Sequence, residues 1–395
     1  MPRLLLFGIV MAAQVAPQCG TSTSPSAPGS SGASNLQAVV VNAGPNNGYI
    51  NGLFTTVTVC VPGQSTCQTI SGVLVDTGSV GLRLLSSVLT LSLPQQNAAV
   101  GGGPVVECAQ FQDGFTWGPV RTADVKLAGK QASNVPIQVV GESAFSNIPS
   151  HCSDTGAAEN TVADLGANGI LGVGFYREDC GQACASNGSS NPGLYYTCPV
   201  GGCTVTPVAS ARQLQNPVWL FSGDNNGVMI QLPSVPAGGT ATVNGSMIFG
   251  ISTQSNNALG SARVLTADAS GNFTTIFNGQ SYPDSFLDSG SNGVFFLDTA
   301  TTGLPVCTDS TEFYCPPRTQ SFSATHRGLN GATTTFSFNV GNADAIPNRF
   351  AAAVELAGPN SGTFDWGLPF FFGRTIFVAI EGQGAPGGAA PYWAY

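Results

Sequence analysis

The chain carries Val-Leu-Val-Asp-Thr-Gly-Ser at residues 73–79 and Ser-Phe-Leu-Asp-Ser-Gly-Ser at residues 285–291. Each string runs an apolar stretch directly into Asp-(Thr/Ser)-Gly-Ser, and the two strings lie in opposite halves of the chain. If the halves face each other, Asp76 and Asp288 can meet. Two carboxylates about 3 Å apart cannot both ionise, so they hold one proton between them. One then acts as a base and the other as an acid at the same pH, which hydrolysis by an activated water requires.

A third copy of the tripeptide shows how easily it arises by chance in a chain with 51 glycines. This copy, Asp154-Thr155-Gly156, follows Pro149–Ser153, which has no strand pattern. We interpret it as a turn, because Asp, Thr and Gly are common turn residues. The two copies that end apolar runs are therefore the candidates for a carboxylate pair.

The composition favours a mostly β protein. The 395 residues suit one large bilobal unit or two domains with an ample core. Short apolar runs broken by Asn-Gly, Asp-Gly and Pro-Gly are typical of strands and turns, and no long amphipathic helix pattern occurs. Only 8% of residues are charged and the net charge is −9, which argues against nucleic acids and anionic membrane surfaces as partners.

Residues 1–18 have the features of an export signal. Arg3 supplies a positive charge, and Leu4–Ala13 is an apolar segment too short to span a bilayer. Residues 19–37 are rich in Ser, Thr, Pro, Gly and Ala, which predicts a flexible linker. Cys19 lies where a bacterial lipoprotein carries its acylated cysteine, so a lipid anchor at Cys19 and loss of Cys19 with the signal are both open. We expect an exported protein, which is periplasmic, anchored to the outer membrane or secreted.

The cysteines support export. Without Cys19, ten of the eleven cysteines remain, and an even number predicts disulfides in an oxidising compartment. Pairing of neighbours in sequence gives Cys60/Cys67, Cys108/Cys152, Cys180/Cys184, Cys198/Cys203 and Cys307/Cys315. The third and fourth pairs, Cys180/Cys184 and Cys198/Cys203, also suggest zinc, but their Gly, Ser and Asn loops and the lack of nearby His disfavour it. We expect no metal and no cofactor.

The chain also shows signs of internal duplication. Asp76 is followed later by Asn168–Gly172, an apolar run closed by Gly, and Asp288 is followed by Phe370–Gly373. We expect each of these to be a strand that packs beside the preceding Asp loop. The duplication predicts an N-terminal lobe over 38–235 and a C-terminal lobe over 236–395.

The order of these segments resembles that of the pepsin-like aspartic proteases, over nearly all of residues 38–381. More closely, it resembles an uncharacterised bacterial family of exported proteins, a domain of unknown function related to the pepsins. Besides the Asp loops, the matching segments are Phe111–Gly114 and Ala123–Leu127 for the flap hairpin and its following strand, Asn168–Gly174 and Phe370–Gly373 for the bracing strands, and Pro217–Phe221 and Gly245–Gly250 for the segment between lobes. The resemblance implies an all-β, bilobal pepsin-like fold with pseudo-twofold related lobes and few short helices.

The resemblance also implies how the pair works. Asp76 and Asp288 would hold one water: one carboxylate takes its proton as it attacks a peptide carbonyl, and the other donates to the carbonyl oxygen. Their neighbours occupy matched positions, namely Thr77, Gly78 and Ser79 in the first loop and Ser289, Gly290 and Ser291 in the second. The glycines let N–H groups approach the carboxylates. The outer serines can donate to the outer carboxylate oxygens, and Thr77 and Ser289 can hydrogen-bond across the lobe junction.

Two positions depart from the pepsin pattern. Phe111 stands where the flap carries a Tyr over the cleft, and Arg83 stands where a Trp follows the first loop. We expect both Phe111 and Arg83 to contact substrate. The loss of both polar partners keeps a second hypothesis open, a weak or inactive peptide-binding or inhibitor protein. A third hypothesis is another β-rich hydrolase that uses the carboxylates on sugar.

Competing sites are few. The only histidines, His151 and His326, lie in segments that we expect to be exposed loops, so Ser–His–Asp and Cys–His sites have few candidates. Gly223–Gly227 could bind calcium, but we interpret it as a turn. The aromatic cluster at 364–372 is expected in the core. The sequence therefore predicts an exported aspartic endopeptidase, a monomer, with an extended peptide lying beneath the hairpin at 108–124.

Overall fold

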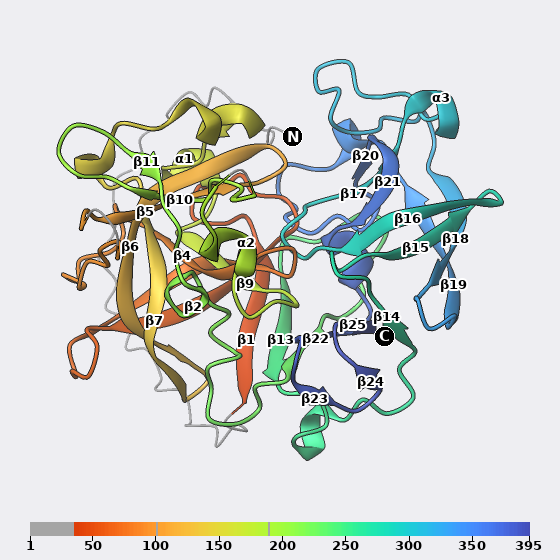
Figure 1. Ribbon diagram of the computed structural model, residues 1–395. Coiled ribbons are helices and arrows are strands. Elements are labelled where there is room, and N and C mark those ends of the chain that lie inside the picture. The colour runs from red at the N-terminus through yellow and green to blue at the C-terminus, as the bar shows by residue number, and fades with distance from the viewer. Residues whose placement is uncertain (1–34, 100–101, 189) are drawn as a thin grey trace, which may run out of the picture.

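The computed structural model describes residues 35–99, 102–188 and 190–395. The expected export signal, Cys19 and nearly all of the expected linker lie outside these residues. The described chain forms two β-rich halves on either side of a shared sheet, with the earlier strands on one side and β15–β21 on the other (Figure 1). This is the all-β, bilobal pepsin-like architecture that the sequence predicts.

The strands are short and numerous, and the helices are few. Up to the shared sheet the strands are β1 Leu36–Asn42, β2 Gly52–Cys60, β3 Cys67–Asp76, β4 Val80–Leu85, β5 Val105–Gln110, β6 Gly114–Leu127, β7 Lys130–Val140, β8 Ala157–Ala158, β9 Gly169–Val173, β10 Tyr195–Thr197, β11 Thr204–Val205, β12 Gly227–Gln231 and β13 Val243–Phe249. The later strands are β14 Val264–Thr266, β15 Phe273–Phe277, β16 Gln280–Leu287, β17 Val294–Leu297, β18 Gln320–Arg327, β19 Thr333–Val340, β20 Ala357–Gly358, β21 Asn360–Trp366, β22 Thr375–Ala379, β23 Gly384–Ala385, β24 Gly388–Ala389 and β25 Tyr392–Ala394. The α-helices are α1 Val162–Leu165, α2 Gln182–Ala185 and α3 Thr299–Thr302, and the 3₁₀-helices are Ser143–Phe145, Ser150–Thr155, Ser210–Arg212, Ser255–Asn257, Ala343–Ala345 and Leu368–Phe371.

In the first half, β3 carries the first Asp loop. Its side chains alternate in exposure at the start and become fully buried over Val73–Asp76. β9 pairs with β3 in parallel, with Gly172 opposite Asp76, and pairs with β4 in the antiparallel sense. A strand buried on both sides by neighbours reads as a continuous apolar run, which is what the sequence of this segment shows.

The second half repeats this arrangement with one correction. β16 carries the second Asp loop and pairs in parallel with β21, where Leu287 lies opposite Trp366, and β17 pairs with β21 in the antiparallel sense. The bracing strand is therefore β21, and the prediction of Phe370–Gly373 was wrong. Phe370 lies in the 3₁₀-helix that follows β21. The sequence pointed to the wrong segment because Asp365 interrupts the apolar run of the true strand.

A shared sheet joins the halves. β1 pairs with β13, β12 lies between β13 and β22, and β22 also pairs with β25. These strands stand side by side between the two halves (Figure 1). The segment at 245–250 thus lies between the lobes as expected. The lobe boundary at 235/236 separates β12 from β13 inside this sheet, and it stays a prediction.

The five disulfides pair neighbouring cysteines as predicted. They are Cys60–Cys67, Cys108–Cys152, Cys180–Cys184, Cys198–Cys203 and Cys307–Cys315. Because the sulfurs at 180, 184, 198 and 203 are bonded to one another, they are not the thiolate ligands of the zinc alternative. Within the described ranges, no helix is long and apolar enough to cross a membrane.

The two histidines have different surroundings. His151 is exposed as expected, and its Nδ1 lies 2.7 Å from Asp154 Oδ2. His326 is fully buried in β18, so the prediction of an exposed loop was wrong. Its Nδ1 hydrogen-bonds the Tyr395 hydroxyl at 2.7 Å, and its ring packs against Trp366 and other aromatic residues. Burial and nearby Arg374 hold the pKa of His326 well below its usual range, so the ring is neutral and belongs to the core.

Candidate active site

The two Asp loops meet at the junction of the halves. A Cβ added to Gly290 would lie 2.7 Å from Asp76 Oδ1 and 3.1 Å from Asp288 Oδ1. A Cβ added to Gly78 would lie 2.8 Å from Asp288 Cγ. Both carboxyls therefore face one point, and each glycine is required because its loop lies against the carboxyl of the opposite half.

Each carboxylate has the same set of donors in its own loop. The N–H of Gly78 and the N–H of Gly290 each donate to the Oδ1 of the Asp in their loop, at 2.7 Å. The hydroxyl of Ser79 donates to the outer oxygen of the first carboxylate, and that of Ser291 donates to the outer oxygen of the second at 2.8 Å. These are the contacts that the sequence predicts for the two glycines and the two outer serines.

Thr77 and Ser289 form a reciprocal pair across the junction. The Ser289 N–H donates to Thr77 Oγ1 at 2.9 Å, and the Thr77 N–H donates to Ser289 Oγ at 3.2 Å. Their hydroxyls continue into the opposite strands: Ser289 donates to Val75 O at 2.8 Å and Thr77 donates to Leu287 O at 3.3 Å. Each half is thus hydrogen-bonded to the backbone of the strand that carries the other half's Asp.

The second carboxyl of the pair holds a proton unusually firmly. Burial, then the charges of Asp76 and Asp365, and a hydrogen bond with Asp76 raise the pKa of Asp288 well above its usual range. The pair therefore keeps a proton at a pH where an ordinary Asp has lost it. One carboxyl of such a pair can donate a proton while the other accepts one.

A cleft of about 730 Å³ opens over the pair. The tip of the hairpin between β5 and β6 lines it through Gln110, Phe111, Gln112 and Asp113. The expected position of Phe111 at the cleft is therefore the one the structure has. The third Asp-Thr-Gly copy is not part of the pair, although its Thr155 lies at the edge of the same cleft.

Arg83 lies outside the cleft lining, which corrects the expected substrate contact. Its guanidinium is buried, 2.5 Å from Glu107 Oε1 and 3.4 Å from Asp179 Oδ2, and its Cζ lies 5.8 Å from the centre of the Phe111 ring. Although burial opposes it, the charges of Glu107 and Asp179 raise the pKa of Arg83. Burial and Glu107 raise the pKa of Asp179 well above its usual range, and Tyr195 donates to Asp179 Oδ1 at 2.7 Å. Arg83 is a buried structural cation because these carboxyls hold it there.

The structure adds two cleft carboxyls that sequence reasoning missed. Asp365 on β21 lies beside the pair, with its Oδ2 2.6 Å from Ser291 Oγ. Glu312 lines the cleft from the segment before β18, and burial raises its pKa. Asp365 belongs to no motif, and its only sequence signal is a charged residue inside the apolar run Phe364–Trp366.

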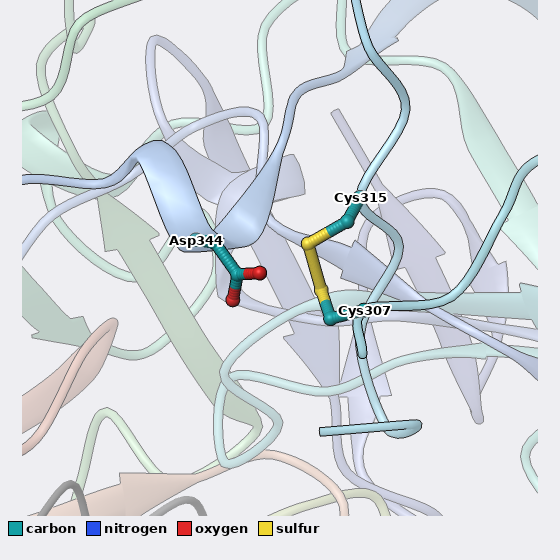
Figure 2. Close-up of side chains that lie close together, drawn as sticks. All are labelled: Cys307, Cys315 and Asp344. Atoms are coloured by element: carbon teal, nitrogen blue, oxygen red, sulfur yellow. A yellow bond between two sulfur atoms is a disulfide. The ribbon is translucent and has the colours of Figure 1, made fainter. Parts of the chain in front are cut away.

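The carboxyl of Asp344 and two sulfurs lie close together (Figure 2). The sulfurs belong to Cys307 and Cys315, which Figure 2 shows joined in one disulfide. A disulfide sulfur is not a thiolate, so this group lacks the donors that a zinc site would need.

The comparisons with known proteins agree with this geometry. The crystal structure of an aspartic proteinase from Irpex lacteus is similar, with a TM-score of 0.53 and 16% identical residues, over 91% of this chain and 96% of that chain. At this identity the likeness shows the fold. Comparison with curated proteins finds no match. A family model described as a protein of unknown function, DUF3443, matches residues 31–395, and the chain therefore belongs to that family.

Proposed function

We propose that the protein is an aspartic-type peptide hydrolase. The observation that carries the proposal is the pair itself: two carboxyls from opposite lobes that face one point, each with the same N–H and hydroxyl donors. Asp76 takes a proton from water as the water oxygen attacks the peptide carbonyl carbon. Protonated Asp288 hydrogen-bonds the carbonyl oxygen as negative charge develops there. The proton then passes to the nitrogen as the C–N bond breaks.

The cleft supports a peptide as the substrate. Its volume and the hairpin tip above the pair suit an extended chain, which can hydrogen-bond the hairpin strands through its backbone. Among the described residues that line it, the charged side chains are carboxyls, including Asp113 and Glu312, and none is Lys or Arg. A cleft of one charge sign attracts the opposite sign, so neutral and basic peptides are the favoured class.

The pair's geometry also favours peptide over sugar. Glycosidase carboxyls lie about 5 Å or more apart. The direct interaction with Asp76 that helps to raise the pKa of Asp288 favours a closer approach than this. We include export in the proposal because five disulfides suit an oxidising compartment. A bacterial source, a periplasmic or outer-membrane location, a lipid anchor at Cys19 and a monomeric state stay predictions from the sequence.

Substitution of each Asp tests the proposal. Asp76→Asn and Asp288→Asn are each expected to lower kcat/KM for a fluorogenic peptide library by about 10²–10⁴-fold or more between pH 3 and pH 8. Asp154→Asn is the matched control, because it alters the same tripeptide outside the pair and should leave the rate unchanged. Hydrolysis that survives both pair substitutions would contradict the proposal.

A second candidate is a peptide-binding protein that does not turn over. It is favoured by Phe111, which leaves the hairpin tip without the hydroxyl of the pepsin pattern, and by the buried position of Arg83. Calorimetry with a peptide-like statine inhibitor distinguishes the candidates. Binding by wild-type protein that never cleaves a peptide would assign this second function.

A further inference from the structure

We propose that Asp365 is a positioning residue of the pair: it donates to Ser291, and so turns the Ser291 hydroxyl toward Asp288. The inference rests on the proposed function, but its geometry can be tested without activity. It concerns a carboxyl that the pepsin-like motifs do not contain. Three features support this role: the number of protons that the contacts of Ser291 require, the burial of Asp365, and the difference between the two lobes at this position.

The hydroxyl of Ser291 contacts two carboxyls at once. Ser291 Oγ lies 2.8 Å from Asp288 Oδ2 and 2.6 Å from Asp365 Oδ2. A hydroxyl has a single hydrogen to donate, and an ionised carboxylate can only accept. Both contacts are hydrogen bonds only if one of the two carboxyls donates its own proton to Ser291. Asp365, Ser291 and Asp288 together therefore hold at least one proton beyond that of the hydroxyl.

The burial of Asp365 locates that proton. Asp365 is 8% exposed, and its Oδ1 is buried without a hydrogen-bond partner, which an ionised carboxylate tolerates far less well than a neutral one. Asp76 and Asp288 face it from the two loops, while Phe286 on β16 and Phe295 on β17, opposite it in the sheet, are apolar. Burial and Asp76 raise the pKa of Asp365 to about 8, against the effect of its bond to Ser291.

The other charged groups along the cleft do not favour ionisation of Asp365. Glu312 also lines the cleft, and as a carboxyl it can only add negative charge there. Below about pH 8, Asp365 is therefore neutral and donates to Ser291, and Ser291 donates to the outer oxygen of Asp288. The proton of the pair then stays on the side of Asp288 that faces Asp76.

The two lobes differ at this position. Asp365 lies opposite Phe286, two residues before Asp288. The equivalent position in the first lobe, opposite Leu74, is Ile170. Ser79 therefore has one carboxyl partner, whereas Ser291 has two. The two carboxyls of the pair are distinguished by this difference, and it is Asp288 that has the proton-holding neighbour.

The consequence is a dependence on pH. When Asp365 ionises, it becomes an acceptor and competes for the Ser291 hydrogen. Asp288 then loses the donor on its outer oxygen. It can hydrogen-bond Ser291 only by donating its own proton to it, which takes that proton away from the side that faces Asp76. Peptide hydrolysis should therefore fall as the pH rises through about 8, where Asp365 loses its proton.

Asp365→Asn tests this directly. The amide NH₂ donates to Ser291 at every pH, so we expect kcat near the wild-type value at pH 5. In the profile of kcat against pH, the fall in rate on the alkaline side should move up by at least about one pH unit. Asp284→Asn on β16 is the control, because that side chain is an exposed carboxyl on the neighbouring strand. An unchanged alkaline fall in Asp365→Asn would overturn the proposal.

Stability provides a readout without activity. A carboxyl whose pKa is raised in the folded state binds its proton more tightly there than in the unfolded chain, so it contributes stability at low pH that is lost as the pH rises. The window for Asp365 runs from about 4, the ordinary Asp value, to about 8. The melting temperature of Asp365→Asn should therefore fall less across this window than that of wild type, whereas Asp284→Asn should match wild type.

The outcomes separate the two proposals. If no variant hydrolyses peptides, the proposed function fails, and the melting series still decides the role of Asp365. If Asp365→Asn does not fold, carboxyl NMR of aspartate-labelled wild-type protein replaces it. A third high-titrating aspartate besides Asp288 and Asp179 supports the inference, and titration of every aspartate except these two in the ordinary range overturns it.

Discussion

At the scale of single residues, the site depends on two glycines, whose lack of a Cβ leaves room for a carboxyl. Gly78 and Gly290 each lie where a Cβ would strike the carboxyl of the opposite lobe. The same residues donate their N–H groups to the carboxylate of their own loop. A glycine here thus positions one carboxylate and makes room for the other, so the two Asp-(Thr/Ser)-Gly motifs are mutually dependent.

Gly290→Ala is expected to separate the pair without removing a carboxyl. The added Cβ would lie 2.7 Å from Asp76 Oδ1, so the loops must move apart by a few tenths of an ångström or more. A displacement approaching 1 Å at reacting groups costs about 10²-fold in rate, and kcat/KM on a peptide substrate measures it. Gly238→Ala is the control, since nothing lies within 4 Å of its Cβ position. Equal rates for both variants would contradict this account.

The sequence identified the residues that carry motifs and missed those that do not. Asp76, Asp288 and their neighbours could be predicted because short-range geometry requires particular residue types at fixed positions. Asp365 could not, because its partner Ser291 is brought to it by the pairing of β16 with β21, which lie far apart in the chain. Arg83 was assigned to substrate because its long-range partner Glu107 cannot be recognised from the sequence.

At the scale of elements, β4 and β5 share a buried ion pair beneath the hairpin. Arg83 on β4 contacts Glu107 on β5, and the same strand β5 leads directly to the tip that lines the cleft. Gln138 on β7 donates to the backbone carbonyl of Glu107 at 2.9 Å, which adds a third strand. The base of the hairpin is therefore fixed by polar contacts in the interior, while its tip remains at the cleft.

Arg83→Met should destabilise the fold through these contacts. Removal of one partner of a buried ion pair leaves an unpaired carboxylate and typically costs about 3–5 kcal/mol. Arg121→Met is the control, since its pair with Glu142 is part-exposed, with side chains 21% and 25% exposed, and such pairs contribute about 1 kcal/mol or less. Urea unfolding measures the free energy of unfolding of both variants. Equal decreases would show that the buried pair stabilises the fold no more than the part-exposed pair does.

At the scale of the whole molecule, two sets of contacts hold the lobes together around the cleft. One is the reciprocal Thr77–Ser289 pair beneath the carboxyls. The other is Asn51, fully buried, whose side chain donates to Asn292 O at 2.7 Å and Ala353 O at 2.8 Å and accepts from the Ala353 N–H at 2.8 Å. The shared sheet also joins the halves.

Asn51→Ala is expected to weaken the junction. It leaves an N–H and carbonyls of the opposite lobe without this partner, at about 1–3 kcal/mol for each buried group that stays unsatisfied. Both Asn51 and Asn134 have a φ of 56°, but Asn134 is exposed. Asn134→Ala therefore reproduces the backbone cost alone, and the difference between the two free energies of unfolding isolates the contacts across the junction. A difference near zero would exclude the role given to Asn51.

The architecture was predictable from the sequence to the level of two lobes with one Asp loop each. The two Asp loops, the signs of internal duplication and the resemblance to the pepsin-like proteases were sufficient for that. The second bracing strand was misplaced because a buried carboxyl, Asp365, broke the apolar pattern on which the prediction depended. The burial of His326 was missed because its aromatic neighbours, such as Trp366, come from distant strands.

The disulfides have a consequence for motion. Four of the five join residues that precede β12 and the fifth joins residues that follow β17, so each of these crosslinks stiffens one side of the cleft. These five disulfides do not cross between the halves, so hydrogen bonds and the shared sheet are what limit a relative movement of the halves. A small rotation about this sheet would widen or narrow the cleft without straining any of the five crosslinks.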